Sequence, residues 1–128
     1  VRISELSLGG FHSLFLEELP AGASGSRLWA CGSGFATGAG QSEESQAYCL
    51  PRIVFPRAGE EVALRGAKIV QLAAGMFHNL ALLETGTLLS WGVGARGRIG
   101  NGQEMDVNAV TPIGLVGFDL SRGPLVDP

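Results

Sequence analysis

The chain has 128 residues, of which 45% are hydrophobic and 16% are charged, and its formal net charge is −3. This composition excludes a disordered chain, because such chains lack the apolar residues that a core needs, and the acidic balance argues against broad attraction to nucleic-acid phosphates. The apolar runs are too short to span a membrane and neither Cys31 nor Cys49 has metal-ligand spacing around it, so we expect an intracellular protein, nuclear or cytoplasmic, with reduced thiols.

An internal repeat organises the sequence from its first predicted strand onward. Residues 3–16 match residues 69–82 at a constant offset of 66, and residues 28–34 match residues 88–94 at an offset of 60. The change of offset places six extra residues in the first copy, between its two matching segments. Because hairpin tips tolerate insertions, each copy is predicted to contain paired strands, joined by a longer turn in the first copy.

The hairpin of the second copy is apolar on both faces. Leu80 and Leu82 alternate there with Ala81 and Leu83 before a compact turn. Successive side chains of a strand point to opposite faces, so both faces of this sheet must be covered. Stacked sheets, as blades of a propeller or layers of a sandwich, satisfy that requirement.

A glycine-rich stretch follows each hairpin, and a polar segment then leads to a proline, Pro51 in the first copy and Pro112 in the second. Closely spaced glycines disfavour a helix, so a strand that continues into a loop is predicted. A connector over residues 52–66 is expected to cross the surface between the copies. The predicted units are a first repeat over residues 1–60, a second repeat over 61–113, and the start of a further connector or truncated repeat over 114–128.

The spacing Gly-x-x-His-Ser/Asn-Leu, a turn, and then Trp-Gly-x-Gly-x-x-Gly-x-Ile-Gly-x-Gly resembles the repeat of the regulator of chromosome condensation family. The motif positions in this chain are Gly9, His12, Gly32, Gly34 and Gly40 in the first copy, and Gly75, His78, Trp91, Gly92, Gly94, Gly97 and Gly100 in the second. The first copy departs from the pattern with Cys31 in place of the tryptophan and Thr37 in place of a glycine.

The resemblance implies an all-β fold, a partial β-propeller with two blades of four-stranded antiparallel sheet and long surface loops. The family's ring has about seven blades, and propellers need about four to eight to close. We therefore expect the chain to be a fragment of a larger propeller, or its remaining blades to come from another chain or from self-association.

A glycine pattern and two histidines could suggest a functional site, but we interpret both as structural. Residues 92–97 match the dinucleotide-binding pattern Gly-x-Gly-x-x-Gly, but Gly100 and Gly102 oppose the helix that this chemistry needs, so a turn and no cofactor are predicted. His12 and His78 lie at the same point of the repeat without a partner at ligand spacing, so each imidazole is expected to bond to backbone across the blade.

Trp29 and Trp91 are predicted to fill the core between the blades, with each indole N–H bonded to a carbonyl. No catalytic, cofactor-binding or metal-ligating residue is predicted, so the chain itself is not expected to be an enzyme. The candidate partner contacts are Arg52, Arg57, Arg65, Arg96 and Arg98, which lie on or beside predicted loops.

The leading functional hypothesis is a protein-interaction scaffold, whose loops over residues 17–27 and 52–66 choose the partner. The resemblance implies two alternatives. One is guanine-nucleotide exchange on a small GTPase, the activity of the family's founding member, and the other is substrate recruitment within a larger enzyme such as a ubiquitin ligase. The expected partners are other blades or another protein chain.

Overall fold

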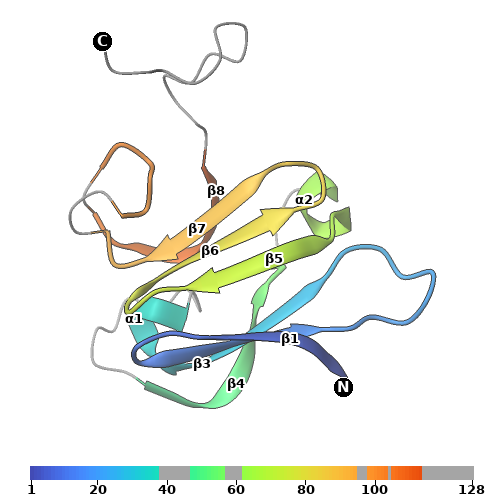
Figure 1. Cartoon of the computed structure of the whole chain (residues 1–128), viewed down its shortest axis with the longest axis horizontal. Helices are drawn as coiled ribbons and strands as arrows, with labels where there is room; N and C mark the ends of the chain where they lie inside the picture. Colours follow the sequence, from blue (N-terminus) through green and yellow to red (C-terminus); the bar gives the residue numbers. More distant parts are fainter. Residues whose placement is uncertain (38–46, 57–61, 95–97, 104, 114–128) are drawn as a thin grey trace, which may run out of the picture.

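The computed structural model describes residues 1–37, 47–56, 62–94, 98–103 and 105–113, and these form two four-stranded antiparallel sheets (Figure 1). The first sheet has the order β1 (Ile3–Leu8), β2 (His12–Glu17), β3 (Arg27–Ser33) and β4 (Ala47–Phe55). The second has the order β5 (Ile69–Ala74), β6 (His78–Leu83), β7 (Leu88–Gly92) and β8 (Val107–Ile113). Two short helices, α1 (Gly34–Thr37) and α2 (Val62–Gly66), complete the described elements. The prediction of an all-β fold is confirmed.

The internal repeat extends to the irregularities of the backbone. The register of β1 against β2 shifts between Ile3 and Glu5, and that of β5 against β6 shifts between Ile69 and Gln71, at the same point of the repeat. Bulges of this kind bend a strand and are built into a fold. The two sheets are therefore copies of one structure, and a residue of one sheet has a defined counterpart in the other.

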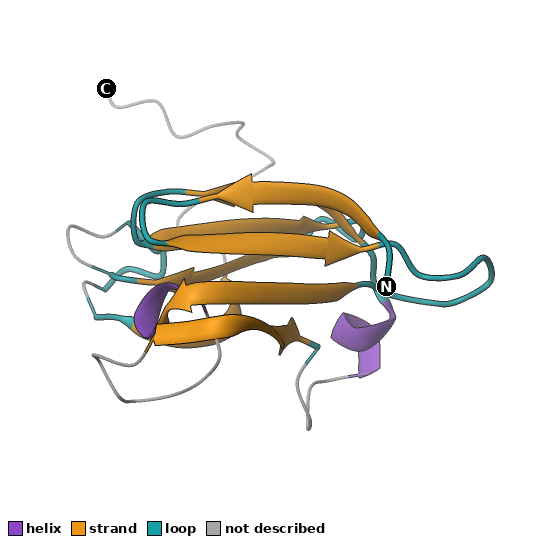
Figure 2. Cartoon of the chain, turned by 90° about the horizontal axis from the view of Figure 1, so that it is seen from below, coloured by secondary structure: helices purple, strands orange, loops and turns teal. Residues whose placement is uncertain are grey.

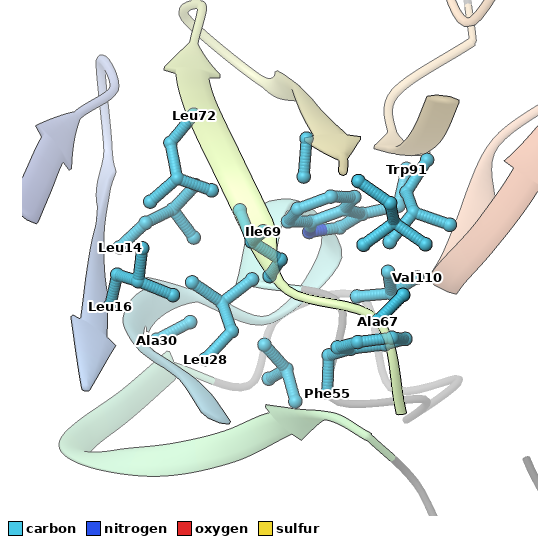
Figure 3. Close-up of a cluster of buried hydrophobic side chains, with 14 residues drawn as sticks. Leu14, Leu16, Leu28, Ala30, Phe55, Ala67, Ile69, Leu72, Trp91 and Val110 are labelled. Carbon is cyan, nitrogen blue, oxygen red and sulfur yellow. The ribbon is translucent and has the colours of Figure 1, made fainter. Parts of the chain in front are cut away.

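The sheets stack face to face, with the core between them (Figures 1, 2 and 3). Side chains of β2 and β3 meet side chains of β5, β6 and β7 in a single buried cluster. Its largest contributors are Leu14, Leu28, Phe55, Leu83, Leu89 and Trp91. Each fully buried leucine contributes about 2 kcal/mol through removal of its apolar surface from water. The contact between the two sheets is thus the main source of stability.

Side chains of the first sheet also hold the free edge of β5. Ser7 Oγ accepts a hydrogen bond from the Ala74 N–H at 3.0 Å, and Ser26 Oγ accepts one from the Ile69 N–H at 2.8 Å. Glu5 Oε2 accepts a longer one from the Leu72 N–H at 3.3 Å. An open strand edge exposes unpaired donors, and these bonds satisfy them without joining the two sheets into one.

Each sheet has the expected fourth strand, but the positions of these strands and of the connector differ from the sequence-based expectation. Residues 47–50 before Pro51 belong to β4 and residues 107–111 before Pro112 belong to β8, so each proline lies inside its strand. An outer strand tolerates proline because one of its edges needs no ladder hydrogen bond. The connector prediction over residues 52–66 is wrong at both ends, since β4 continues to Phe55 and α2 occupies the last five residues.

The prediction of a loop directly after β3 is also wrong, because Gly34–Thr37 form the helix α1. Thr37 stands where the family pattern has a glycine, and removing a glycine lowers the penalty on helix formation. The predicted boundary at residues 60 and 61 and the predicted segment 114–128 lie outside the described residues. The last described residue of β4 and the first of α2 lie on either side of that boundary.

Candidate interaction surfaces and the junction between the sheets

A buried polar junction joins the two sheets at the start of β2 and β6. His12 Nε2 lies 2.5 Å from Asn79 Oδ1, and Asn79 Nδ2 donates to the Ala36 carbonyl of α1 at 2.6 Å. Because only the amide nitrogen can donate to that carbonyl, the amide oxygen faces the imidazole, and His12 Nε2 therefore carries the proton. The acceptor for His12 is thus a side-chain amide of the other sheet, and the expected backbone partner is wrong.

The glycine three residues before each histidine makes room for the imidazole. A Cβ on Gly9 would overlap the ring of His12, and a Cβ on Gly75 would lie 2.6 Å from Cε1 of His78. The same glycines close the turn, because each donates its N–H to the histidine carbonyl, at 2.9 Å in the first copy and 2.7 Å in the second. The Gly-x-x-His spacing therefore describes a turn folded around its own imidazole.

Gly32, the second-last residue of β3, and Gly92, the last residue of β7, have a second steric role. Gly32 pairs with His12 and Gly92 with His78, and both glycines have φ of +112°. A Cβ on Gly32 would meet the Phe11 carbonyl oxygen, and the contact repeats in the second copy. Side chains rarely adopt this backbone conformation, so glycine is required on both grounds.

The remaining motif glycines are placed as follows: Gly34 opens α1, Gly94 donates its N–H to Asp106 at 2.9 Å, Gly100 lies in a turn, and Gly40 and Gly97 lie outside the described residues.

The environment of both histidines favours the neutral imidazole. Burial lowers the pKa of His12, although the bond to Asn79 opposes this shift. Burial also lowers the pKa of His78, and the charges of Arg98 and then His12 add to the effect. Within the described residues, no group of three or more His, Cys, Asp or Glu side chains is arranged to hold a metal ion.

The two tryptophans lie in different environments. Trp91 is fully buried in the core as predicted, but its indole nitrogen has no hydrogen-bond partner among the described residues. Trp29 is only half-buried, and the prediction that it fills the core between the sheets is wrong. It alternates along β3 with Leu28 and Ala30, which face the second sheet, so its side chain points to the outer face.

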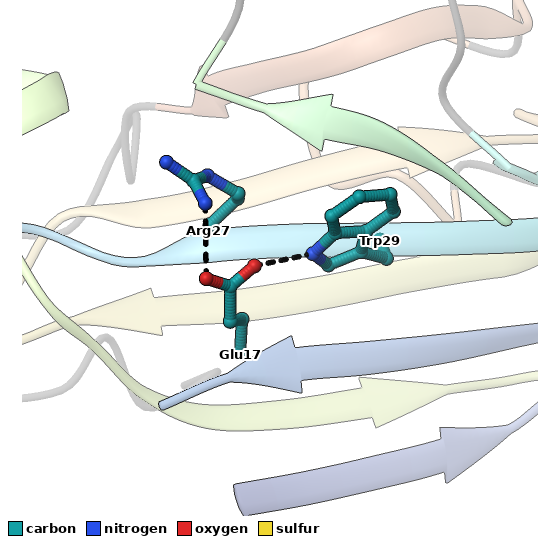
Figure 4. A network of polar contacts seen from close by, with 3 residues as sticks. All are labelled: Glu17, Arg27 and Trp29. Carbon is teal, nitrogen blue, oxygen red and sulfur yellow. Dashed lines mark hydrogen bonds and ion pairs between the residues drawn. The ribbon is translucent and has the colours of Figure 1, made fainter. Parts of the chain in front are cut away.

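On that outer face Trp29 belongs to a polar network that the sequence did not predict (Figure 4). Trp29 Nε1 donates to Glu17 Oε1 at 2.8 Å, and Arg27 Nη1 donates to Glu17 Oε2 at 2.9 Å. The hydrogen bond from Trp29 lowers the pKa of Glu17, burial opposes that shift, and the Arg27 charge reinforces it. Both carboxylate oxygens are thus bonded, although sequence spacing alone cannot place three such side chains together.

A second unpredicted feature lies on the turns that join β1 to β2 and β5 to β6. The rings of Phe11 and Phe77 stack with centroids 5.0 Å apart and an interplanar angle of 10°. Phe11 is 60% exposed and Met76 beside it is 61% exposed. Gly10 links the turns by donating its N–H to the Gly75 and Met76 carbonyls. We call Gly10, Phe11, Met76 and Phe77 the aromatic turn surface.

The predicted arginine contacts do not all fall on described residues. Arg52 is exposed on β4, Arg65 is exposed at the end of α2, and Arg98 is half-buried beside His78. Arg57 and Arg96 lie outside the described residues. The predicted recognition loop between β2 and β3 lies at the opposite end of the strands from the aromatic turn surface (Figure 1).

Comparison with known proteins agrees with the family resemblance of the internal repeat. The family model described as the regulator of chromosome condensation (RCC1) repeat matches residues 69–98. RCC1 domain-containing protein 1 of Mus musculus is 31% identical over 99 residues, which cover 77% of this chain and 22% of that protein. The mitochondrial RCC1 domain-containing protein RUG3 of Arabidopsis thaliana is 49% identical over 39 residues, or 30% of this chain and 9% of that protein. The chain thus spans less than a quarter of either relative.

The solved structure of Prp20p from Saccharomyces cerevisiae, reported with its binding to Gsp1p and histones, superposes with a TM-score of 0.67. The sequences are 25% identical, over 89% of this chain and 26% of Prp20p. The two stacked sheets are consecutive blades of a β-propeller. The chain carries two repeats of the regulator of chromosome condensation family, as its motifs predicted. Among the described residues, no helix is long and apolar enough to cross a membrane.

Proposed function

We propose that the chain is part of a protein-interaction scaffold and that its aromatic turn surface contacts the partner. The observation that carries this proposal is the stack of the exposed Phe11 ring on the half-buried Phe77 ring. The two rings occupy the same position of each repeat, outside the core. Exposed aromatic and methionine side chains that are grouped in this way are typical of contact sites.

Backbone hydrogen bonds hold the turns below this surface in place, which favours binding. Each is closed by its glycine-to-histidine hydrogen bond, and Gly10 ties one turn to the other. A side chain that is already fixed loses less entropy when a partner covers it, so such positions contribute more to affinity. Prp20p, which resembles this chain, binds other proteins, and this supports the same class of function here. The proposal assigns no chemical step to these residues.

Site-specific photocrosslinking tests this proposal. Benzoylphenylalanine replaces Phe11 or Phe77 in the protein expressed in cells, and the matched control places it at Ala21, which is exposed on the β2–β3 loop at the other end of the strands. We expect discrete protein adducts from positions 11 and 77 and none from position 21. Adducts from position 21 alone, or no adducts at all, would contradict the proposal.

Guanine-nucleotide exchange is a second candidate, favoured by the similarity to Prp20p, a protein that binds Gsp1p. One assay distinguishes the two candidate functions: it measures the release of a fluorescent guanine nucleotide from a panel of small GTPases. Accelerated release by the chain, abolished by Phe11→Ala, would make the aromatic turn surface an exchange site. Binding of a GTPase without release of its nucleotide would support only the scaffold function.

A further inference from the structure

A turn on the surface of the second blade carries the sequence Asn101-Gly102. It lies between β7 and β8, and it is drawn in orange in Figure 1. Ile99 is only 1% exposed and anchors the turn in the protein, whereas residues 100–103 are exposed. The turn therefore presents an asparagine and the glycine that follows it to water.

The Asn101 side chain is folded back over the main chain that follows it. Its Oδ1 accepts a hydrogen bond from the Gln103 N–H at 3.0 Å, so the side-chain carbonyl spans the Gly102 residue. Asparagine in turns commonly bonds its own backbone two residues further on. A donor on a carbonyl oxygen also stabilises the negative charge that this oxygen gains when a nucleophile adds to the carbonyl carbon.

The Gly102 amide nitrogen is the nearest nucleophile along the chain, and it is available for attack. Its N–H has no hydrogen-bond partner among the described residues. Gly102 has φ of +82°, and a Cβ built on it would meet no heavy atom within 4 Å. Because glycine has no side chain, the approach of this nitrogen to the Asn101 carbonyl carbon is sterically unhindered.

We propose that Asn101 is a site of spontaneous deamidation through a cyclic imide. The Gly102 nitrogen loses its proton to the solvent and forms a bond to Asn101 Cγ, while the side-chain nitrogen takes up a proton and leaves as ammonia. Water then opens the five-membered ring at either carbonyl, which leaves an aspartate or an isoaspartate at position 101. Water is the only co-reactant, and ammonia is the only small product.

The products change both the charge and the backbone of the turn. Each product adds one carboxylate, which makes the formal net charge of −3 more negative by one unit. In the isoaspartate the main chain runs through the former side-chain carbonyl, so it is longer by one carbon and the acceptor for the Gln103 N–H is displaced. The loop after β7 begins at Val93, whose N–H donates to the Phe77 carbonyl, so the new charge appears at the end of the strands that carries the aromatic turn surface.

The other two asparagines of the chain provide internal controls. Asn79 is completely buried in β6, and both atoms of its amide have polar partners. Asn108 lies within β8. Each is followed by a residue with a side chain, whereas Asn101 is followed by glycine and lies outside the helices and strands. Ring closure at Asn79 or Asn108 therefore needs a local opening of the sheet.

Tandem mass spectrometry of the folded chain tests this proposal. The chain is incubated at fixed pH and temperature, and the conversion of amide to acid is measured at each asparagine. We expect Asn101 to react about tenfold or more faster than Asn79 and Asn108, because those two need local opening. Isoaspartate should be among the products, and an isoaspartyl methyltransferase detects it by transferring a labelled methyl group.

The chain unfolded in guanidinium is the reference for the effect of the fold. Asn101 should react at least as fast in the folded chain as in the unfolded chain, while Asn79 should react faster after unfolding. An Asn101 amide that stays intact in the folded chain but reacts in the unfolded chain would overturn the proposal, because the turn would then protect it. Equal rates at all three asparagines of the folded chain would overturn it as well.

Two variants test the chemical route. Gly102→Ala keeps the Asn101 amide but hinders the attacking nitrogen, so deamidation at position 101 should slow severalfold. Asn101→Gln retains a side-chain amide that cannot close the five-membered ring, so the fast reaction should disappear. Thermal melts verify that both variants fold. Unchanged deamidation in Gly102→Ala would contradict the cyclic route.

Discussion

At the scale of single residues, the junction of His12, Asn79 and Ala36 explains why the repeat conserves its spacing within this chain. The His12 imidazole lies over Gly9 and donates a hydrogen bond to the Asn79 amide of the second blade. The turn of the first blade is thereby joined to the second blade. His78 has the same turn but faces outward from the second blade. In the first blade Ser13 stands at the position of Asn79.

The first residue-scale prediction concerns the energy of this junction. Asn79→Ala leaves the His12 N–H and the Ala36 carbonyl without a partner in a buried site, and should destabilise the fold by about 1–3 kcal/mol. His12→Ala should cost a similar amount, and the double variant less than the sum, because both changes remove the same bond. Urea unfolding measures all three. Thr85→Ala at the exposed β6–β7 turn serves as the control and should be additive with Asn79→Ala.

The second residue-scale prediction concerns pH. Both histidines have a pKa below the ordinary value of 6.5 in the folded chain, so the unfolded chain binds more protons as the pH falls through that value. Stability should therefore be complete above pH 6.5 and should decrease as the pH falls below it. A loss of about 1 kcal/mol corresponds to a fall in Tm of about 4 °C for a chain of this size.

Thermal melts between pH 8 and pH 5 measure this effect, and His12→Gln should flatten the profile. A Tm that rises on acidification would mean that the histidines gain protons on folding, which is the opposite of what their burial implies.

At the scale of elements, the sequence predicted the hairpins because their apolar residues recur in two copies. The paired strands β2 and β3, and β6 and β7, follow directly from the offsets of 66 and 60. The resemblance implied four strands in each blade, but the residue pattern did not locate β4 and β8, because Pro51 and Pro112 are typical of loops and only pairing with β3 and β7 makes these segments strands.

The candidate surfaces were predictable to different extents. Phe11 and Phe77 occupy equal positions of the repeat, so a shared role could have been inferred from the alignment, whereas their stacking depends on how the blades meet. The contact of Glu17 with Trp29 depends on the register of β2 against β3, which a loop of unknown geometry sets. Sequence spacing carries no information on such cross-strand pairs.

At the scale of the whole molecule, the interface between the two blades supplies most of the core. Each blade also has an outer face that lies away from this interface. The buried cluster joins both blades, while Phe15 and Trp29 on one side and Leu82 and Leu88 on the other face away from it. The stability of the fold and the position of the aromatic turn surface both depend on the stacking of the two blades. The stacking of the two blades therefore holds the described fold together.

Hydrogen exchange measured by NMR at the outer edge of β5 tests it most directly. The amides of Ile69, Leu72 and Ala74 donate to side chains of the first blade, so they should exchange as slowly as the core amides. Their repeat counterparts on β1, the amides of Ile3, Leu6 and Leu8, provide the comparison and should exchange faster. Equally fast exchange at both edges, with slow exchange inside each sheet, would show that the blades fold without stacking and would contradict the account.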